Sequence, residues 1–163
     1  MVIDIERKTL DRAPEEKWDD EPGHYFRTSR WWWRPLTNYI SQIDPTIASQ
    51  CTRWWSIEGE GLNEEQALAL AKRLREEHIS GRLAQYARDY DQRLNSLPLQ
   101  DCTVCEGTRN SIPSPQSGPS DQQCTACQGS GKTKNRECNY HFSEENVMNF
   151  ANFLEHCQGF EFY

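Results

Sequence analysis

The amino-acid sequence predicts an α+β fold that is mainly helical, a small helix bundle of three or four helices with a four-cysteine hairpin inserted before the last helix. Three observations lead to this prediction. Apolar residues recur at helical spacing between Asn63 and Asn95, and again after Ser143. Two CxxC pairs lie between these helical stretches. A stretch rich in Pro, Ser, Gly and Gln separates the two pairs, and residues 111–121 within it are expected to form a flexible loop.

The composition limits how the chain can form a core. Of its 163 residues, only 36% are hydrophobic, but six Trp, six Tyr and six Phe are among them. Each aromatic side chain can remove roughly 150–250 Å² of surface from water when it is buried. We therefore expect the core to depend on its aromatic residues.

The first 23 residues differ in composition from the rest of the chain. They are rich in charged side chains and contain two prolines and one glycine. A segment of this kind has little apolar surface to bury, so residues 1–23 are expected to form a flexible polar arm.

A Trp-rich segment and a helix pair are expected in residues 24–99. Pro35 is a candidate first residue for a short helix. Asn63 is a good N-cap, and Gln66 completes a capping box, so a longer helix should begin directly after Asn63. A second helix follows the Ser80-Gly81 break, and the short connection favours antiparallel packing of the pair.

Residues 140–163 are predicted to form a C-terminal helix and a short strand that pack on the Trp-rich segment and helix pair. Ser143 is the expected N-cap, and apolar residues on either side of it fit a hydrophobic staple. Gly159 is the expected end of the helix. The staple residues are Phe142 and Val147.

The cysteine-rich segment, residues 100–139, contains CTVCEG and, after a spacer, CTACQGSG. A CxxC turn directs two sulfurs at one ion, and glycine after each pair permits a left-handed backbone whose amides approach the thiolates. Two such pairs separated by 18 residues predict one tetrahedral zinc site. The predicted ligands are Cys102, Cys105, Cys124 and Cys127.

Four thiolates leave no open coordination position, so the zinc ion is expected to be structural rather than catalytic. Two disulfides or four structural thiols without a metal are the alternatives for these cysteines. Cys138 and His141 stand nearby at CxxH spacing and could supply extra ligands, but a second tetrahedral site would need a further partner. Cys51 and Cys157 are expected to be small buried residues.

The cysteine module resembles the CxxCxGxG repeats of J-domain co-chaperones. That family carries four repeats that form two zinc sites, whereas this chain has two, and Thr108-Arg109 departs from the glycine-rich pattern. The chain also lacks the His-Pro-Asp tripeptide that defines a J-domain. The resemblance covers about 40 residues. It implies a zinc hairpin and not a chaperone partnership.

A second resemblance spans most of the chain. WWWRPL, the helix pair, the CxxC pairs and FSEENVMNFA follow one another in an order that is similar to small uncharacterised zinc-finger-like proteins of bacteria and their phages. That resemblance implies a regulator encoded by a bacterium or a phage, and it supplies no activity.

The WWW run is the main indication of function. Neighbouring residues of a helix or strand point in different directions, so Trp31, Trp32 and Trp33 cannot all enter one core. At least one indole should face solvent, another element or a partner. Trp and Arg dominate interface hot spots, and Arg30 and Arg34 flank the run. We therefore expect a non-enzymatic, zinc-stabilised interaction or adaptor protein with a protein partner.

Other function classes stay open. The main alternative is a small enzyme whose site is assembled only in three dimensions. A nucleic-acid-binding zinc finger is disfavoured, because the formal charge is −7 and four thiolates with one zinc bring it to about −9. No stretch approaches the roughly 20 apolar residues of a membrane span, and the charged N-terminus has no signal-peptide pattern. We therefore expect a cytoplasmic protein.

Overall fold

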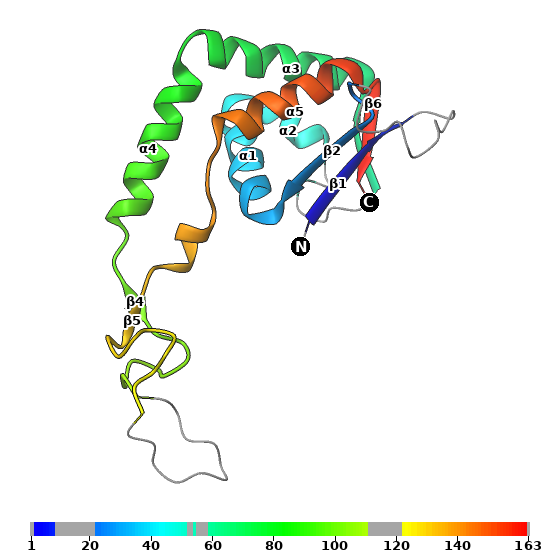
Figure 1. The fold of residues 1–163 in the computed structure, drawn as a ribbon. Helices are drawn as coiled ribbons and strands as arrows, with labels where there is room; N and C mark the ends of the chain where they lie inside the picture. The colour runs from blue at the N-terminus through cyan, green and yellow to red at the C-terminus, as the bar shows by residue number, and fades with distance from the viewer. Residues whose placement is uncertain (1, 9–21, 52–53, 55–58, 111–121, 163) are drawn as a thin grey trace. The chain divides into compact units, whose positions relative to one another are not determined.

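The computed structural model describes residues 2–8, 22–51, 54, 59–110 and 122–162. The chain divides into two compact units. The first unit comprises Met1–Asp91 and Tyr140–Tyr163, and the second comprises Gln92–Asn139. Figure 1 labels the helices and strands of both units.

The first unit contains a four-stranded antiparallel sheet in the order β2-β1-β6-β3 (Figure 1). Ile5 of the central strand β1 lies opposite Phe26 on one neighbour and Phe162 on the other. Within the described part of the chain, β2 and β3 are the edge strands. The strands are β1 (Val2–Arg7), β2 (Tyr25–Ser29), β3 (Gly59–Asn63) and β6 (Gly159–Phe162).

Helices α1 (Arg30–Ile43), α3 (Glu64–Ile79) and α5 (Glu144–His156) contact the sheet. The short helix α2 (Pro45–Gln50) follows α1, and α4 (Arg82–Ser96) runs from the first unit into the second. Alternate strand residues turn toward the helices and join them in one buried core. These strand residues are Ile3, Ile5, Phe26, Leu62, Phe160 and Phe162.

The fold is α+β, but a sheet replaces the expected helix bundle. The expectation of a flexible arm over residues 1–23 is wrong for Val2–Arg7, which form the strand β1. Ile3 and Ile5 are 1% and 0% exposed. These two apolar residues alternate with charged residues, as expected for a strand with one buried face. The alternation is too short to be recognised as a strand within a segment that is charged throughout. Residues 9–21 lie outside the described residues.

The predicted N-caps are confirmed. The side chain of Asn63 accepts a hydrogen bond from the Gln66 N–H at 2.9 Å, and the Gln66 side chain accepts one from the Asn63 N–H at 3.0 Å. Ser143 accepts from the Asn146 N–H at 3.1 Å, so α5 also begins where the sequence indicates.

Three local details differ from expectation. Helix α1 begins at Arg30, so Pro35 lies inside the helix rather than at its start. Helix α5 ends at His156, and Gly159 begins β6 instead of ending the helix. The predicted antiparallel pairing of α3 with α4 is wrong, because α3 packs mainly on α5.

A buried carboxylate fixes the turn between α3 and α4. Glu77 is 3% exposed, and Arg82 at the start of α4 donates to it from Nε and Nη2 at 3.0 and 2.8 Å. Arg73 and Tyr39 bind the same carboxylate at 2.9 and 3.2 Å. The hydrogen bonds from Arg82 lower the pKa of Glu77 below its usual value. The turn therefore holds the ionised carboxylate.

The second unit is a small hairpin with a short 3-10 helix. Its strands are β4 (Gln100–Asp101) and β5 (Lys132–Thr133), and the 3-10 helix η2 spans Arg136–Asn139. The unit begins at Gln92 rather than at residue 100, because the end of α4 contacts η2. Arg93 pairs with Glu137 at 2.9 Å. The predicted loop over residues 111–121 lies outside the described residues.

Replacing Ile5 by Ala is expected to destabilise the first unit by about 2–5 kcal/mol, because it removes buried methylene groups from the central strand. Urea unfolding followed by tryptophan fluorescence measures the effect, since every tryptophan belongs to the first unit. Val2→Ala is the matched control in the same strand. Val2 is 49% exposed, so this change should cost less than about 0.5 kcal/mol. Equal, small effects of both substitutions would contradict the placement of β1 in the core.

Candidate metal centre

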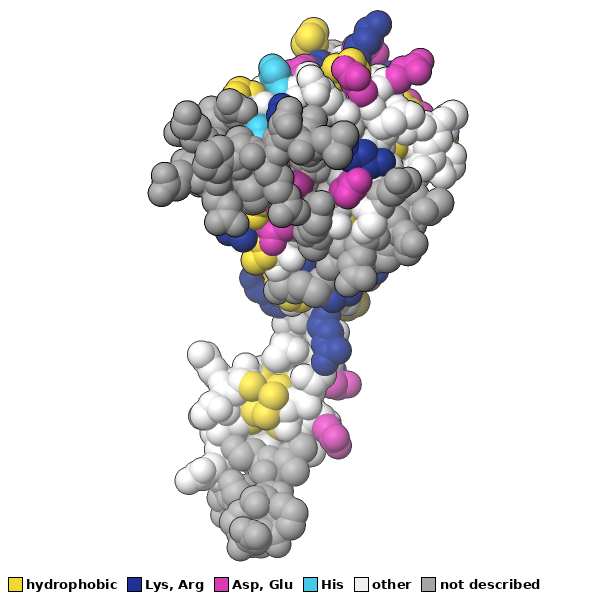
Figure 2. Space-filling view, turned by 90° about the vertical axis from the view of Figure 1, so that its right-hand side faces the viewer, with side chains coloured by type: hydrophobic (Ala, Val, Ile, Leu, Met, Phe, Trp, Pro, Cys, Tyr) yellow, Lys and Arg dark blue, Asp and Glu magenta, His cyan; other side chains and the backbone are white. Residues whose placement is uncertain are grey.

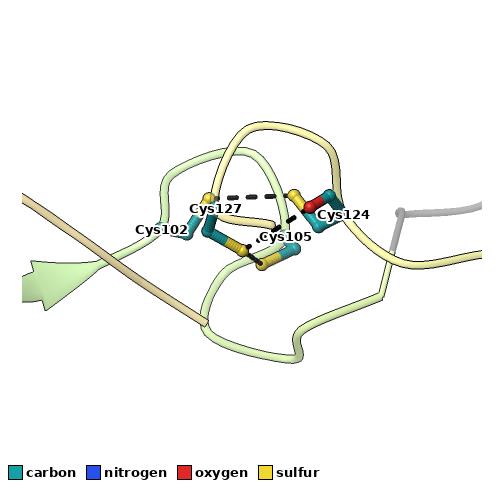
Figure 3. A group of neighbouring side chains, drawn as sticks. All are labelled: Cys102, Cys105, Cys124 and Cys127. Carbon is teal, nitrogen blue, oxygen red and sulfur yellow. Dashed lines mark hydrogen bonds between the residues drawn. The ribbon is translucent and has the colours of Figure 1, made fainter. Parts of the chain in front are cut away.

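The second unit brings the four predicted cysteines into one cluster (Figure 3). Cys102 directly follows β4, and Cys105 lies in the turn after it. Cys124 and Cys127 lie in a second turn, which leads toward β5. Two segments that are separated in the sequence therefore each contribute one CxxC pair.

The sulfur positions fit one tetrahedral ion. The Sγ atoms of Cys102 and Cys124 are 3.9 Å apart, and those of Cys105 and Cys127 are 3.7 Å apart. All four Sγ atoms lie within 4.8 Å of one another, and all four residues are buried. Zinc–sulfur bonds of about 2.3 Å in a tetrahedron place sulfurs about 3.8 Å apart. A disulfide needs about 2.0 Å. The cluster could thus hold one metal ion such as zinc, and its spacing does not fit disulfides.

The two CxxC turns share one backbone conformation. The Thr108 N–H donates to the Cys105 carbonyl at 2.8 Å, and the Ser130 N–H donates to the Cys127 carbonyl at 3.0 Å. The two residues after each pair have positive φ angles in both turns. These residues are Glu106 (50°), Gly107 (80°), Gln128 (51°) and Gly129 (75°).

Reciprocal hydrogen bonds join the two turns. The Cys102 N–H donates to the Gly131 carbonyl, and the Cys124 N–H donates to the Arg109 carbonyl, both at 2.9 Å. Arg109 and Gly131 are thus equivalent positions, with φ angles of 72° and 75°. The first repeat departs from the glycine pattern at Arg109, yet it keeps the backbone conformation. For an L-residue this conformation costs roughly 1–2 kcal/mol.

Backbone amides stabilise the sulfur of Cys127. The Gly131 N–H donates to Cys127 Sγ at 3.3 Å. Burial acts to raise the pKa of the Cys127 thiol, but the N–H groups of Gly131 and Gly129 contribute to lowering it, and the pKa falls to about 6. For Cys105, burial dominates and raises the pKa to about 11. In the same unit, Lys132 pairs with Asp101 at 2.6 Å.

The remaining cysteines lie outside this cluster. Cys138 Sγ donates to the Leu94 carbonyl at 3.6 Å. In the described ranges, the four clustered cysteines are the only set of three or more His, Cys, Asp or Glu side chains within mutual reach of one ion. Cys51 and Cys157 are 2% and 0% exposed, which confirms that they are small buried residues. Burial raises the pKa of Cys157 to about 11.

The WWW run lies at the start of α1 in the first unit, and its three indoles differ in burial, as expected. Trp33 is 1% exposed, and its indole N–H donates to the Trp54 carbonyl at 2.9 Å. Trp31 and Trp32 are each 44% exposed. The prediction that the three indoles cannot share one core is therefore confirmed.

Both arginines that flank the run are exposed, and one of them is held by an aromatic ring. The Arg34 guanidinium lies 5.0 Å from the centre of the Tyr140 ring and donates to the Tyr140 hydroxyl at 2.9 Å. The Trp31 ring lies 4.9 Å from the same tyrosine ring. Arg34, Trp31 and Tyr140 thus form one exposed aromatic and cationic group beside Trp32 and Arg30.

A groove of about 690 Å³ lies beside β2, and the sequence patterns described above did not predict it. All five residues of β2 line it, together with Trp32 of α1. Its opposite wall is α5, through Phe153 and three asparagines at every third position, Asn146, Asn149 and Asn152. That repeat was the available signal, because asparagine is a poor helix former and three on one stripe are unusual.

No protein-family model, curated protein or solved structure matches the chain. The cysteine cluster is consistent with a zinc-binding module, and no family is identified. None of the helices in the described ranges has the length and apolar character needed to cross a bilayer.

Gly131→Ala is expected to weaken metal binding at least about tenfold, which corresponds to 1.4 kcal/mol. The new Cβ would lie 2.8 Å from the Gly107 carbonyl oxygen, at a residue whose φ is 75°. Competition titration of the protein with zinc and a chromophoric chelator measures the affinity. Gly81→Ala is the control, because Gly81 has a φ of 76° but nothing within 4 Å of its Cβ position. It should leave metal affinity unchanged, and equal losses in both variants would contradict the packing described between the turns.

Proposed function

We propose that the protein is a non-enzymatic interaction protein. One structural zinc ion stabilises its second unit, and an exposed aromatic surface on its first unit binds a protein partner. We name this surface the tryptophan surface. Its residues are Arg30, Trp31, Trp32, Arg34 and Tyr140.

The donor set supports a structural role for the metal. Four thiolates complete the tetrahedral shell of a zinc ion, so no position is left for water or substrate. In the described part of the second unit, the buried apolar cluster consists of the four cysteines themselves. Metal coordination, rather than apolar burial, would therefore supply most of the folding free energy of this unit.

Two neighbouring half-exposed indoles are the main support for partner binding. Trp31 and Trp32 are fixed on a helix whose next residue, Trp33, is locked in the core. Buried Trp and Arg side chains at interface centres commonly contribute the largest share of binding energy. Because Tyr140 already holds Arg34, that side chain would lose less rotamer freedom when a partner binds.

The charge of the chain favours a protein partner over a nucleic acid. Proteins that follow a phosphate backbone rely on clustered Lys and Arg, whereas this chain carries a formal charge of −7. On the face shown in Figure 2, acidic and basic side chains are both present on the first unit. Interspersed charges of both signs differ from the single-sign basic patch on which binding to a phosphate backbone relies.

The purified protein is expected to contain about one equivalent of zinc by elemental analysis. Cys124→Ser should reduce the zinc content to near zero, because one of the four ligands is lost. Amide hydrogen exchange should then show that the second unit has lost its protection, since coordination is its main source of folding free energy.

Cys138→Ser is the matched control for the zinc experiment. Cys138 belongs to the same unit but lies outside the cluster, so this variant should keep its zinc and its protection from exchange. A zinc-free wild type, or a Cys124 variant with unchanged zinc content and exchange, would contradict the structural role of the metal.

Trp31→Ala and Trp32→Ala are each expected to weaken partner binding by about 2 kcal/mol or more, roughly 30-fold, as at interface hot spots. Proteins captured from a lysate of the source cell identify the partner, and calorimetry with the purified partner then gives the affinity. Ile79→Ala is the control, since Ile79 is 84% exposed in the same unit but outside the tryptophan surface. Wild-type affinity in both Trp variants would exclude this surface as the binding site.

A further inference from the structure

We propose that an extended peptide of the partner protein binds in the groove between β2 and α5. The peptide would add to the sheet beside β2 and place an acidic side chain near Arg27 and apolar side chains toward α5. We call this the β2 groove, and the residues that line it include Tyr25–Ser29, Trp32, Asn146, Asn149, Asn152 and Phe153. The inference rests on the proposed function in one respect, that the partner is a protein.

The edge of β2 offers hydrogen-bonding groups that a strand can use. In the described ranges, β2 pairs with β1 alone. The Arg7 N–H donates to the His24 carbonyl at 3.1 Å. Because bonded pairs alternate along an antiparallel ladder, Phe26 and Thr28 also direct their backbone groups at β1. Tyr25 and Arg27 therefore direct their N–H and C=O groups away from β1, into the groove.

The opposite wall carries amides that can also bind a peptide backbone. Asn146 is buried, and it accepts a hydrogen bond from the Thr28 hydroxyl at 2.9 Å, which ties α5 to β2. Asn149 and Asn152 are exposed in the groove. Each side-chain amide has both donors and an acceptor, which matches the groups of a peptide backbone. Since asparagine weakens a helix relative to alanine, these two positions cost α5 stability without an evident packing role.

The size of the groove suits about five residues of extended chain. A strand that runs along the five residues of β2 would be about 17 Å long at 3.4 Å per residue. Gly23, before the start of β2, lies close to α5 at this end of the groove, because an added Cβ would lie 2.3 Å from the His156 backbone. Trp32 lies on the wall near the other end of β2, so a peptide in the groove would reach the tryptophan surface.

The charge and polarity of the walls define the side chains of the peptide. Among the described residues that line the groove, Arg27 is the one cationic side chain and none is a carboxylate, in a chain of charge −7. The Arg27 side chain is 64% exposed even though its Nε binds Asp4 at 2.8 Å. Side chains of an added strand alternate between faces. A residue opposite Arg27 would share the face of Arg27, and its neighbours would turn toward Phe153 and Trp32. The expected motif is an acidic residue between two apolar ones.

The first experiment is a selection from a random eight-residue peptide library, displayed on phage, against the full-length zinc-loaded protein. Enriched sequences should contain an acidic residue flanked by apolar residues and should lack proline. A synthetic enriched peptide should protect the amides of Tyr25 and Arg27 from hydrogen exchange. Methylation of every second backbone nitrogen in that peptide should abolish binding when the methylated nitrogens are those that face β2. Methylation of the other set should leave binding intact.

Variants of the protein separate backbone from side-chain contributions. Arg27→Pro removes an N–H that faces the groove and not β1, a position where an edge strand tolerates proline. It should weaken the peptide at least tenfold, whereas Arg27→Ala, which keeps the N–H, should weaken it less. Asn149→Ala and Asn152→Ala should each reduce affinity several-fold. The control Asn95→Ala, at an exposed asparagine of α4, should not.

Three outcomes would overturn the inference: no enrichment of the acidic and apolar motif, binding without protection of Tyr25 and Arg27, or sedimentation showing a dimer of the chain that Arg27→Pro dissociates. Binding measurements with the purified partner distinguish an error in the groove inference from an error in the proposed role of the tryptophan surface. If Trp31→Ala prevents partner binding and a folded Arg27→Pro does not, the groove inference is wrong and the proposed function stands. If only Arg27→Pro prevents it, the tryptophan surface is wrong.

Discussion

The burial of the Trp33 indole is the packing constraint on which the first unit depends. Its ring meets Phe150 of α5 and Phe162 of β6 edge-on, with centroid distances of 5.5 and 5.7 Å. One side chain of α1 therefore joins the last helix and the last strand to the core. Because an α-helix has 3.6 residues per turn, burial of this residue turns Trp31 and Trp32 away from the core. The same constraint thus orders the interior and creates the exposed aromatic surface.

The two units reach stability by different physical means. The first buries an aromatic and aliphatic cluster in which strand and helix side chains interlock. In the second, the described buried cluster consists of four cysteine side chains, and the turns around them contain residues with positive φ angles. Apolar burial is graded and tolerant of exchange between similar residues, whereas coordination needs every ligand. A side-chain substitution of similar size should therefore destabilise the core of the first unit less than it destabilises the second unit when it replaces one of the four clustered cysteines.

The sequence correctly predicted the features that depend on residues close together in the chain. The caps at Asn63 and Ser143 each depend on residues three positions apart, and the cysteine cluster depends on two CxxC turns with fixed internal geometry. The sheet was missed because its pairing is not local: β1 needs β6, at the other end of the chain order, and contributes only Ile3 and Ile5 to the core. The groove was missed for the same reason, since its two walls come from β2 and α5 and only the fold brings them together.

The position of β6 has a consequence for the order in which the chain can acquire its structure during synthesis. β3 pairs with β6, and β6 also pairs with β1, so two earlier strands lack a neighbour until the ribosome has made Gly159–Phe162. The cysteine unit precedes β6, and its two ends meet where Arg93 pairs with Glu137. A metal ion captured early would close this segment on itself and shorten the loop that must be crossed when β6 docks. If the second unit holds zinc as proposed, the supply of zinc would then affect the rate at which the sheet is completed.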